Sequence, residues 1–174
     1  MARAEPALAT PRLALEPLGT EHAEAMYRVL AQAAIYRHLD VDAPASVAAL
    51  REVYARQSAG GPADGSEVWC NWIVAPHGGP PIGYVQATLI ARRRAWVAYV
   101  LEPASWGRGF AWEATAAMLA HLRAAHRIVE FRAQVEADNA RSIRLLERLG
   151  FAAAAHPDVE LAATERLYLR HETR

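Results

Sequence analysis

The fold is decided by the stretch Ser105-Trp106-Gly107-Arg108-Gly109-Phe110-Ala111-Trp112-Glu113-Ala114. An apolar run typical of a strand, residues 96–101, precedes it, and a helical pattern follows it to about residue 126. The stretch therefore predicts a strand, a tight glycine turn and the start of a helix. Glycines let the backbone turn sharply and approach a ligand, and the unpaired N–H groups of a helix's first turn attract anions. The sequence indicates a phosphate site.

Three phosphate-binding designs use such a turn, and the residue types choose among them. A P-loop needs Gly, four spacers and then Gly-Lys-Ser/Thr, and the chain has no such run. A dinucleotide fingerprint needs a third small residue at position 112, where the chain has Trp112. The third design is a Gln/Arg-x-x-Gly-x-Gly/Ala turn over the pyrophosphate of coenzyme A. This turn is found in the GNAT acetyltransferases, and the string from Trp106 to Ala111 resembles it. The Trp at its first position resembles the form of the turn in the RimJ/RimL-type branch of the family.

A second segment resembles the same family. Residues 138–151, Asp-Asn-Ala-Arg-Ser-Ile-Arg-Leu-Leu-Glu-Arg-Leu-Gly-Phe, are similar to its Asn-x-x-Ser-x-x-Leu-x-(charged)-x-Gly-Phe pattern. Asn139 stands where a strand ends and a helix begins, and Ser142 follows three residues later, facing roughly the same way. Alone, the two residues equally fit an N-cap and a helix-surface hydroxyl.

Length and composition bound the architecture. At 174 residues the chain has the size of one domain, and we expect a frayed N-terminus over residues 1–11 and a single domain over 12–174. The formal net charge is zero, so neither nucleic acid nor membrane is expected as a partner. One cysteine fits a reducing compartment, and no apolar run approaches a membrane span, so a cytoplasmic protein is expected.

Hydrophobic periodicity predicts the order β-α-α-β-β-β-α-β-α-β-β. The expected strands are 12–18, 67–75, 82–90, 95–101, 128–136, 151–156 and 164–171. The expected helices follow caps at Thr20, at Ser46 and at Asp138 or Asn139, and the glycine turn starts another over 109–125. This order resembles the GNAT fold, an α/β (α+β) architecture. It implies a central mixed, mostly antiparallel sheet, splayed into a coenzyme A wedge, with helices on both faces.

The resemblance implies an acetyl-CoA-dependent N-acetyltransferase in which a primary amine attacks the thioester directly in a ternary complex. The backbone of Tyr99, Val100 and Leu101 would polarise the acetyl carbonyl. The N–H groups of the turn would hold the pyrophosphate, with an added contact from Arg108; its residues are Trp106, Gly107, Arg108, Gly109, Phe110 and Ala111. Asn139 would meet the pantetheine arm, and Ser142 would protonate the leaving thiolate.

Several carboxylates are candidates for the general base. Glu102 ends the strand beside the expected wedge and is the first candidate; a solvated strand end is the alternative reading. Its rivals are Glu136, Asp158 and Glu160. Tyr168 is an alternative to Ser142 as the acid, although its alternating strand is typical of packing.

The expected acceptor loops, 35–44 and 156–164, carry Asp40, Asp42, Asp158 and Glu160. We expect them to favour a cationic amine, whose identity nothing in the sequence selects. No metal is expected, because the histidines lack ligand spacing and His121 and His126, five residues apart, do not share a helix face. Cys70 reads as a small core residue rather than a nucleophile.

Two further functions remain as alternatives. One is a non-catalytic acyl-CoA-binding sensor or interaction domain with the same fold. The other is a nucleotide-binding domain, which Trp112 opposes. The resemblance also allows a homodimer, since dimers are common in the family.

Overall fold

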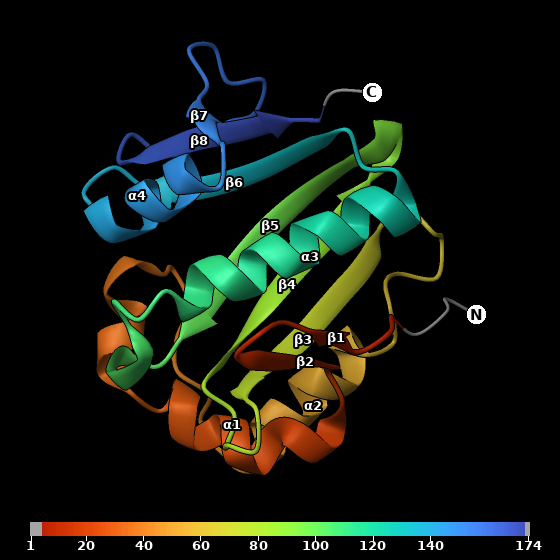
Figure 1. Ribbon diagram of the computed structural model, residues 1–174, viewed down its shortest axis with the longest axis vertical. Helices are drawn as coiled ribbons and strands as arrows, with labels where there is room; N and C mark the ends of the chain where they lie inside the picture. The colour runs from red at the N-terminus through yellow and green to blue at the C-terminus, as the bar shows by residue number, and fades with distance from the viewer. Residues whose placement is uncertain (1–4, 173–174) are drawn as a thin grey trace.

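The computed structural model describes residues 5–172 of the chain. Its centre is an eight-stranded sheet in the order β1-β2-β3-β4-β5-β6-β8-β7 (Figure 1). The strands are β1 Leu8–Ala9, β2 Leu13–Pro17, β3 Val68–Pro76, β4 Gly83–Ile90, β5 Arg94–Leu101, β6 Glu130–Glu136, β7 Ala152–Ala153 and β8 Glu165–His171. The α-helices are α1 Ala23–Leu30, α2 Val47–Gln57, α3 Phe110–His126 and α4 Ala140–Arg148. Four short 3₁₀ turns complete the order: η1 Thr20–His22, η2 Ala33–His38, η3 Ala91–Arg93 and η4 Pro103–Ser105.

The sheet opens between β5 and β6. Strands β5 and β6 are parallel, and only Arg94–Trp96 and Glu130–Arg132 pair along them. All other neighbouring strands pair antiparallel, and β4 follows β5 without interruption to Leu101. Beyond Trp96, β5 and β6 therefore diverge into a wedge, which Figure 1 shows between the green and the blue strands. The expected mixed and splayed sheet is confirmed.

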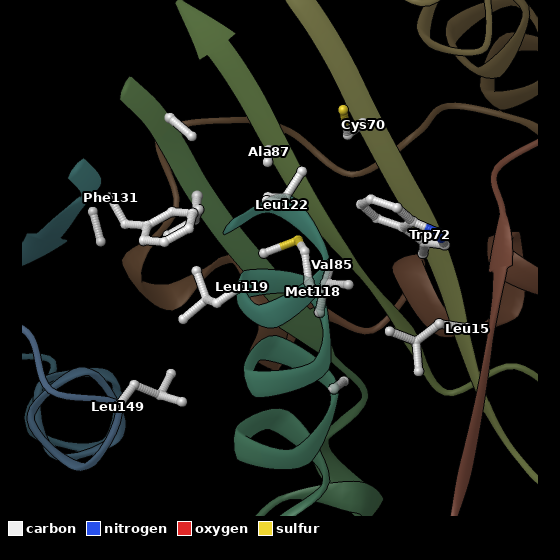
Figure 2. Close-up of a cluster of buried hydrophobic side chains, with 14 of the residues drawn as sticks. Leu15, Cys70, Trp72, Val85, Ala87, Met118, Leu119, Leu122, Phe131 and Leu149 are labelled. Carbon is white, nitrogen blue, oxygen red and sulfur yellow. The ribbon is translucent and has the colours of Figure 1, made fainter. Parts of the chain in front are cut away.

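Helices cover both faces of the sheet because its strands alternate apolar side chains between two cores. The larger core lies between α3 and the sheet, where Trp72 of β3 and Phe131 of β6 flank Met118 and Leu119 of α3 (Figure 2). The other core joins α1 and α2 to the opposite face, and Ile73 contributes to it. Burial of each such side chain stabilises the fold by about 1.5 to 3 kcal/mol.

Most expected element ends agree with the structure, and two differ. Ser46 caps α2 and Asn139 caps α4, each through a side-chain oxygen that accepts a backbone N–H, at 3.1 Å in both cases. Thr20 does not cap a helix, because a 3₁₀ turn beginning at Thr20 leads into α1 and Gly19 precedes it. The strand expected over 151–156 is only two residues long.

The N-terminal segment differs from the frayed segment expected over residues 1–11. Residues 1–4 lie outside the described part of the chain. Beyond them, Leu8 and Ala9 pair with β2 as an additional edge strand, and the carbonyl of Pro6 accepts a 2.9 Å hydrogen bond from Trp72 Nε1. An indole N–H in the core needs such a partner. This hydrogen bond and the β1–β2 pairing hold residues 6–9 in a fixed position, which the composition of the segment did not predict.

Candidate active site

The glycine turn has the geometry of an anion site. Gly107 and Gly109 adopt φ values of 73° and 78°, a left-handed conformation that side chains rarely tolerate. Gly109 is the N-cap of α3 and has no side chain to satisfy the first turn. Among the described residues, the N–H groups of Gly107, Arg108 and Gly109 donate no backbone hydrogen bond. These groups, at the positive end of a 17-residue helix, are therefore available to an anionic ligand.

An ion pair from the N-terminal strands holds the turn in place. Glu113, in the first turn of α3, accepts hydrogen bonds from Arg12 Nε (2.6 Å), the Arg12 backbone N–H (2.9 Å) and the Thr10 hydroxyl (2.6 Å). Burial alone would raise the pKa of Glu113, but the hydrogen bonds from Thr10 and Arg12 outweigh it and lower that pKa. Arg12 also donates to the Arg108 carbonyl at 2.9 Å. Sequence reasoning missed this clamp because its partners lie 101 residues apart.

Three arginines lie beside the turn, and each packs its guanidinium group over an aromatic ring. Arg12 and Arg108 each lie 4.7 Å from the centroid of Phe110, whose side chain is buried in the core. Arg141 stacks on Trp106 at 3.5 Å. Such contacts are worth about 0.5 to 2 kcal/mol each. They keep three cations beside the N–H groups that the sequence assigns to a pyrophosphate.

Trp106 replaces the first residue of the family pattern and has a structural partner. Its indole Nε1 donates to the Leu101 carbonyl at the end of β5, at 2.7 Å. The tryptophan thus joins the turn to the strand that precedes it. It also lines the wedge, together with Ala111.

The wedge contains a cavity of about 330 Å³ between β5 and β6. Its lining comes from both strands, from the start of α4, from η2 and from the glycine turn. Of the predicted site residues, the cavity brings together Tyr99, Val100, Leu101, Trp106, Ala111, Glu136, Asn139 and Ser142.

The backbone of β5 presents two of its three predicted groups to the cavity. The Glu102 N–H donates to the Ile82 carbonyl at 2.8 Å, on the β4 side. Alternate residues of an antiparallel strand turn their backbone groups to the same neighbour, so Val100 also faces β4. Tyr99 and Leu101 then face the open side. The Leu101 carbonyl, which accepts from Trp106, agrees with this alternation.

Ser142 lies in a hydroxyl pair that sequence reasoning did not find. Tyr99 Oη is 2.6 Å from Ser142 Oγ, and it also donates to the Ser142 carbonyl at 3.3 Å. Burial raises the pKa of Tyr99 to about 12, against the lowering effect of the Ser142 hydrogen bond. Tyr99 therefore keeps its proton at neutral pH. The Asn139 side-chain oxygen accepts from the Ser142 N–H at 3.1 Å, so the helix cap also orients Ser142.

The predicted bases fall into different environments. The Glu102 carboxylate accepts from the buried Ser105 hydroxyl at 3.1 Å and is not part of the cavity lining, whereas Glu136 is. Asp158 forms a two-pronged ion pair with Arg132, at 2.9 and 2.7 Å. This pairing lowers the pKa of Asp158, which opposes a role as base. Glu160 is exposed and also outside the lining.

The expected acidic acceptor surface is weaker than its composition suggested. Arg132 and Arg94 face Asp158, at 2.7 and 3.6 Å, and offset its charge. Asp40 lines the cavity, and Asp42 is exposed outside it. The alternative acid, Tyr168, packs in the larger core rather than in the cavity lining.

Two titratable residues of the cavity were not singled out by sequence reasoning. His38, at the end of η2, lines the cavity, and its Nδ1 lies 3.2 Å from Asp138 Oδ1. Glu165, the first residue of β8, also lines it. His38 belongs to the loop that the sequence assigned to the acceptor. Its partner Asp138 lies a hundred residues away, so no local pattern identifies the pair.

Comparison with known proteins identifies the family of the chain. A family model described as "Acetyltransferase (GNAT) domain" matches residues 12–152. The chain therefore belongs to the GNAT acetyltransferases, and it is an N-acetyltransferase of that family. A search of curated protein sequences found no match.

Solved structures share the fold at low sequence identity. RimL, a ribosomal L7/L12 alpha-N-protein acetyltransferase in complex with coenzyme A, is 16% identical with a TM-score of 0.81, over 95% of this chain and 98% of that one. Mycobacterium smegmatis RimJ in complex with CoA-disulfide is 21% identical with a TM-score of 0.76, over 91% and 81%. A chimera of spermidine N-acetyltransferase SpeG from Vibrio cholerae and hSSAT is 17% identical with a TM-score of 0.72, over 91% and 95%.

Among residues 5–172, no helix combines the length and the apolar character that a membrane crossing requires.

Proposed function

We propose that this acetyltransferase moves the acetyl group of acetyl-CoA to a primary amine by direct attack in a ternary complex. One observation carries the proposal: a single cavity joins the free N–H groups of β5 to the Tyr99–Ser142 hydroxyl pair. The glycine turn lies at the same end of β5, where it would hold the pyrophosphate. The coenzyme A complexes of RimL and RimJ support this placement, as structures of the same fold.

The chemistry needs three groups, and the cavity offers each. The amine nitrogen attacks the thioester carbonyl, and the N–H groups of Tyr99 and Leu101 stabilise the oxyanion that forms. The carbon–sulfur bond then breaks, and the Ser142 hydroxyl protonates the thiolate. Tyr99 Oη, 2.6 Å from Ser142 Oγ, can then donate its proton to the serine oxygen. The amine proton passes to a base, and its release to solvent with return of a proton to Ser142 restores both groups, so an amide and free coenzyme A result.

We assign the base to His38. An imidazole held by a carboxylate through one ring nitrogen presents the other nitrogen to a substrate, and His38 contacts Asp138 through Nδ1 while it lines the cavity. Glu136 lines the same cavity and is the second candidate. Glu102 would need its carboxylate to leave the Ser105 hydroxyl.

Coenzyme A binding would follow from the turn and the adjoining cap. The N–H groups of Gly107, Arg108, Gly109, Phe110 and Ala111 would face the pyrophosphate, beside the cations of Arg108 and Arg141. The Trp106 N–H, also expected to contribute, donates instead to the Pro103 carbonyl at 3.1 Å. Asn139 uses its side-chain oxygen as a cap, which leaves its amide nitrogen for the pantetheine arm.

The acceptor class is a primary amine, either a protein N-terminus or a small molecule. The related structures bear names for both kinds, an alpha-N-protein acetyltransferase and a spermidine N-acetyltransferase. The cavity wall formed by Ala34, Ile35 and Leu39 is apolar, and Asp40 and Glu165 add carboxylates. This wall favours an acceptor that carries a cationic group close to an apolar one.

The test is coenzyme A release from acetyl-CoA with a panel of N-terminal peptides, polyamines and small amines. Turnover with one amine class, abolished when Ser142 and His38 are replaced together, is the expected result. Tight acetyl-CoA binding without turnover on any amine would instead identify a non-catalytic acyl-CoA-binding domain. Tighter binding of ATP or NAD than of acetyl-CoA would contradict the assignment of the glycine turn.

A further inference from the structure

A group of metal-ligand side chains lies at the far end of α3 from the glycine turn. Glu5, His121 and His126 place one ligand atom each within 4.8 Å of one another. Glu5 Oε2 is 2.6 Å from His121 Nε2, and Glu5 Oε1 is 2.8 Å from His126 Nε2. The turn and this group are separated by most of a 17-residue helix, about 20 Å at 1.5 Å per residue.

The N-terminal segment creates this group by bringing a carboxylate to two imidazoles. The five-residue spacing of the histidines places their Cα–Cβ bonds on different sides of α3, and the sequence therefore gave no reason to expect a shared ligand. Glu5 bridges them with one oxygen to each ring. The spacing argument considered the two histidines without Glu5, which brings both rings into one group. The group uses residues that the acetyl-transfer site leaves aside.

We propose that Glu5, His121 and His126 bind one divalent transition-metal ion of the Zn²⁺ class. Two imidazole nitrogens and a carboxylate oxygen form a donor set that zinc uses with three protein ligands and an open fourth position. Zn²⁺ is a borderline ion that accepts both nitrogen and oxygen, whereas calcium and magnesium prefer oxygen alone.

The spacing of the group is close to that of a metal centre. Donor atoms around one tetrahedral zinc ion are about 3.3 Å apart, given bonds near 2.0 Å. The two oxygen–nitrogen distances, 2.6 and 2.8 Å, are those of hydrogen bonds and need to open by roughly 0.5 to 0.7 Å. Rotation of the carboxylate and of two ring side chains supplies a movement of this size without a backbone shift.

The surroundings favour a cation. The exposed fractions of the side chains are 11% for Glu5, 16% for His121 and 27% for His126, so the site is sheltered yet open to solvent. His126 is the last residue of α3, at the negative end of the helix dipole. The edge-on contact of Trp72 with His121, at 5.7 Å between ring centroids, fixes the plane of that imidazole.

The bound ion would attach the N-terminal segment to α3. The segment is already fixed at Pro6 by Trp72 and at β1 by pairing with β2. Cys70 lies at the same place and donates to Glu5 Oε1 at 3.5 Å, as an outer partner that orients the carboxylate. The proposal is independent of the acetyl-transfer chemistry and makes no use of the wedge.

The experiment is a titration of chelator-treated full-length protein with Zn²⁺ by calorimetry, repeated with Co²⁺ by visible absorption. We expect one ion per chain, a Co²⁺ spectrum of four-coordinate intensity, and a Tm that rises with Zn²⁺. His121→Gln, His126→Gln and Glu5→Gln should each weaken binding at least about tenfold. The matched control is His156→Gln, in the exposed terminal hairpin, which should leave the affinity unchanged.

Two results would overturn the proposal. One is the absence of saturable binding in wild type, which would leave Glu5 as an acceptor of two ordinary hydrogen bonds. The other is equal Zn²⁺ affinity in wild type and in a His121→Gln/His126→Gln double variant, which would place the ion elsewhere. Circular dichroism of each variant without metal separates loss of a ligand from loss of the fold.

Discussion

Tyr99 Oη lies 2.6 Å from Ser142 Oγ, and this contact joins the two sides of the wedge. Tyr99 comes from β5 and Ser142 from the first turn of α4, 43 residues apart. Because burial keeps the tyrosine protonated, its hydroxyl can donate to the serine while the serine donates to a ligand. Two residues that motif reasoning treated separately therefore act as one unit.

The first prediction concerns this pair. Ser142→Ala and Tyr99→Phe should each lower kcat by about a hundredfold, the usual contribution of a positioned acid. The double variant should lose little more than the worse single variant, since paired groups are not additive. Steady-state coenzyme A release measures all three. Tyr168→Phe is the matched control, and a larger loss there than in Tyr99→Phe would make Tyr168 the acid.

The second prediction concerns the turn. Gly109→Val should raise the Kd for acetyl-CoA by more than about tenfold, because a side chain at φ 78° strains the N-cap and its Cβ meets Arg12 Nη2 at 3.3 Å. Gly78→Val, in a distant hairpin with φ 70° and nothing within 4 Å, carries similar strain and should leave the Kd unchanged. Unaltered binding by the Gly109 variant, measured by calorimetry, would show that the turn is not the pyrophosphate site.

The third prediction concerns the clamp between Arg12 and Glu113. Glu113→Gln removes the charge that accepts three hydrogen bonds and should cost about 1 to 2 kcal/mol of unfolding free energy. It should also weaken acetyl-CoA several-fold, because Arg12 loses its anchor beside the turn. Urea unfolding and calorimetry measure the two effects. Arg56→Gln, exposed on α2, is the control for an arginine change, and Arg12→Gln should match Glu113→Gln rather than this control.

The fourth prediction separates the candidate bases. His38→Gln should lower kcat/KM by about a hundred- to ten-thousandfold, the usual contribution of a positioned base. Asp138→Asn should produce a smaller loss through its contact with His38. Glu102→Gln and Glu136→Gln, assayed alongside, should retain most activity. A small loss of kcat/KM in His38→Gln together with a large loss in Glu136→Gln would transfer the role to Glu136.

The fifth prediction is alkaline instability. Burial raises the pKa of Tyr84 and of Tyr99 to about 12, above the value of about 10 in an unfolded chain. The folded state therefore binds more protons between about pH 10 and 12, and its stability falls as pH rises through that window. Urea unfolding at pH 8, 10 and 11 measures this loss. Tyr84→Phe should flatten the dependence, and an unchanged dependence in this variant would contradict the prediction.

Local motifs predicted the parts of the site that one segment builds. The turn around Gly109 and the cap at Asn139 depend on neighbouring residues, so the local residue pattern, together with the family resemblance, located them. The partners of the site are different, because the fold brings them from distant segments: Arg12 to Glu113, and His38 to Asp138. Charge counting failed at Asp158 for the same reason, since the arginine that offsets it lies 26 residues away.

The three-residue pairing of β5 and β6 also divides the sheet into two hydrogen-bonded slabs, β1–β5 and β6–β8. What joins them is mainly apolar packing, as where Phe131 and Leu149 reach Leu119 (Figure 2). Amide protons on the two sides can then exchange through separate local openings. A ligand bound in the wedge would contact both slabs and hold them together. Its binding would therefore slow amide hydrogen exchange in both slabs at once.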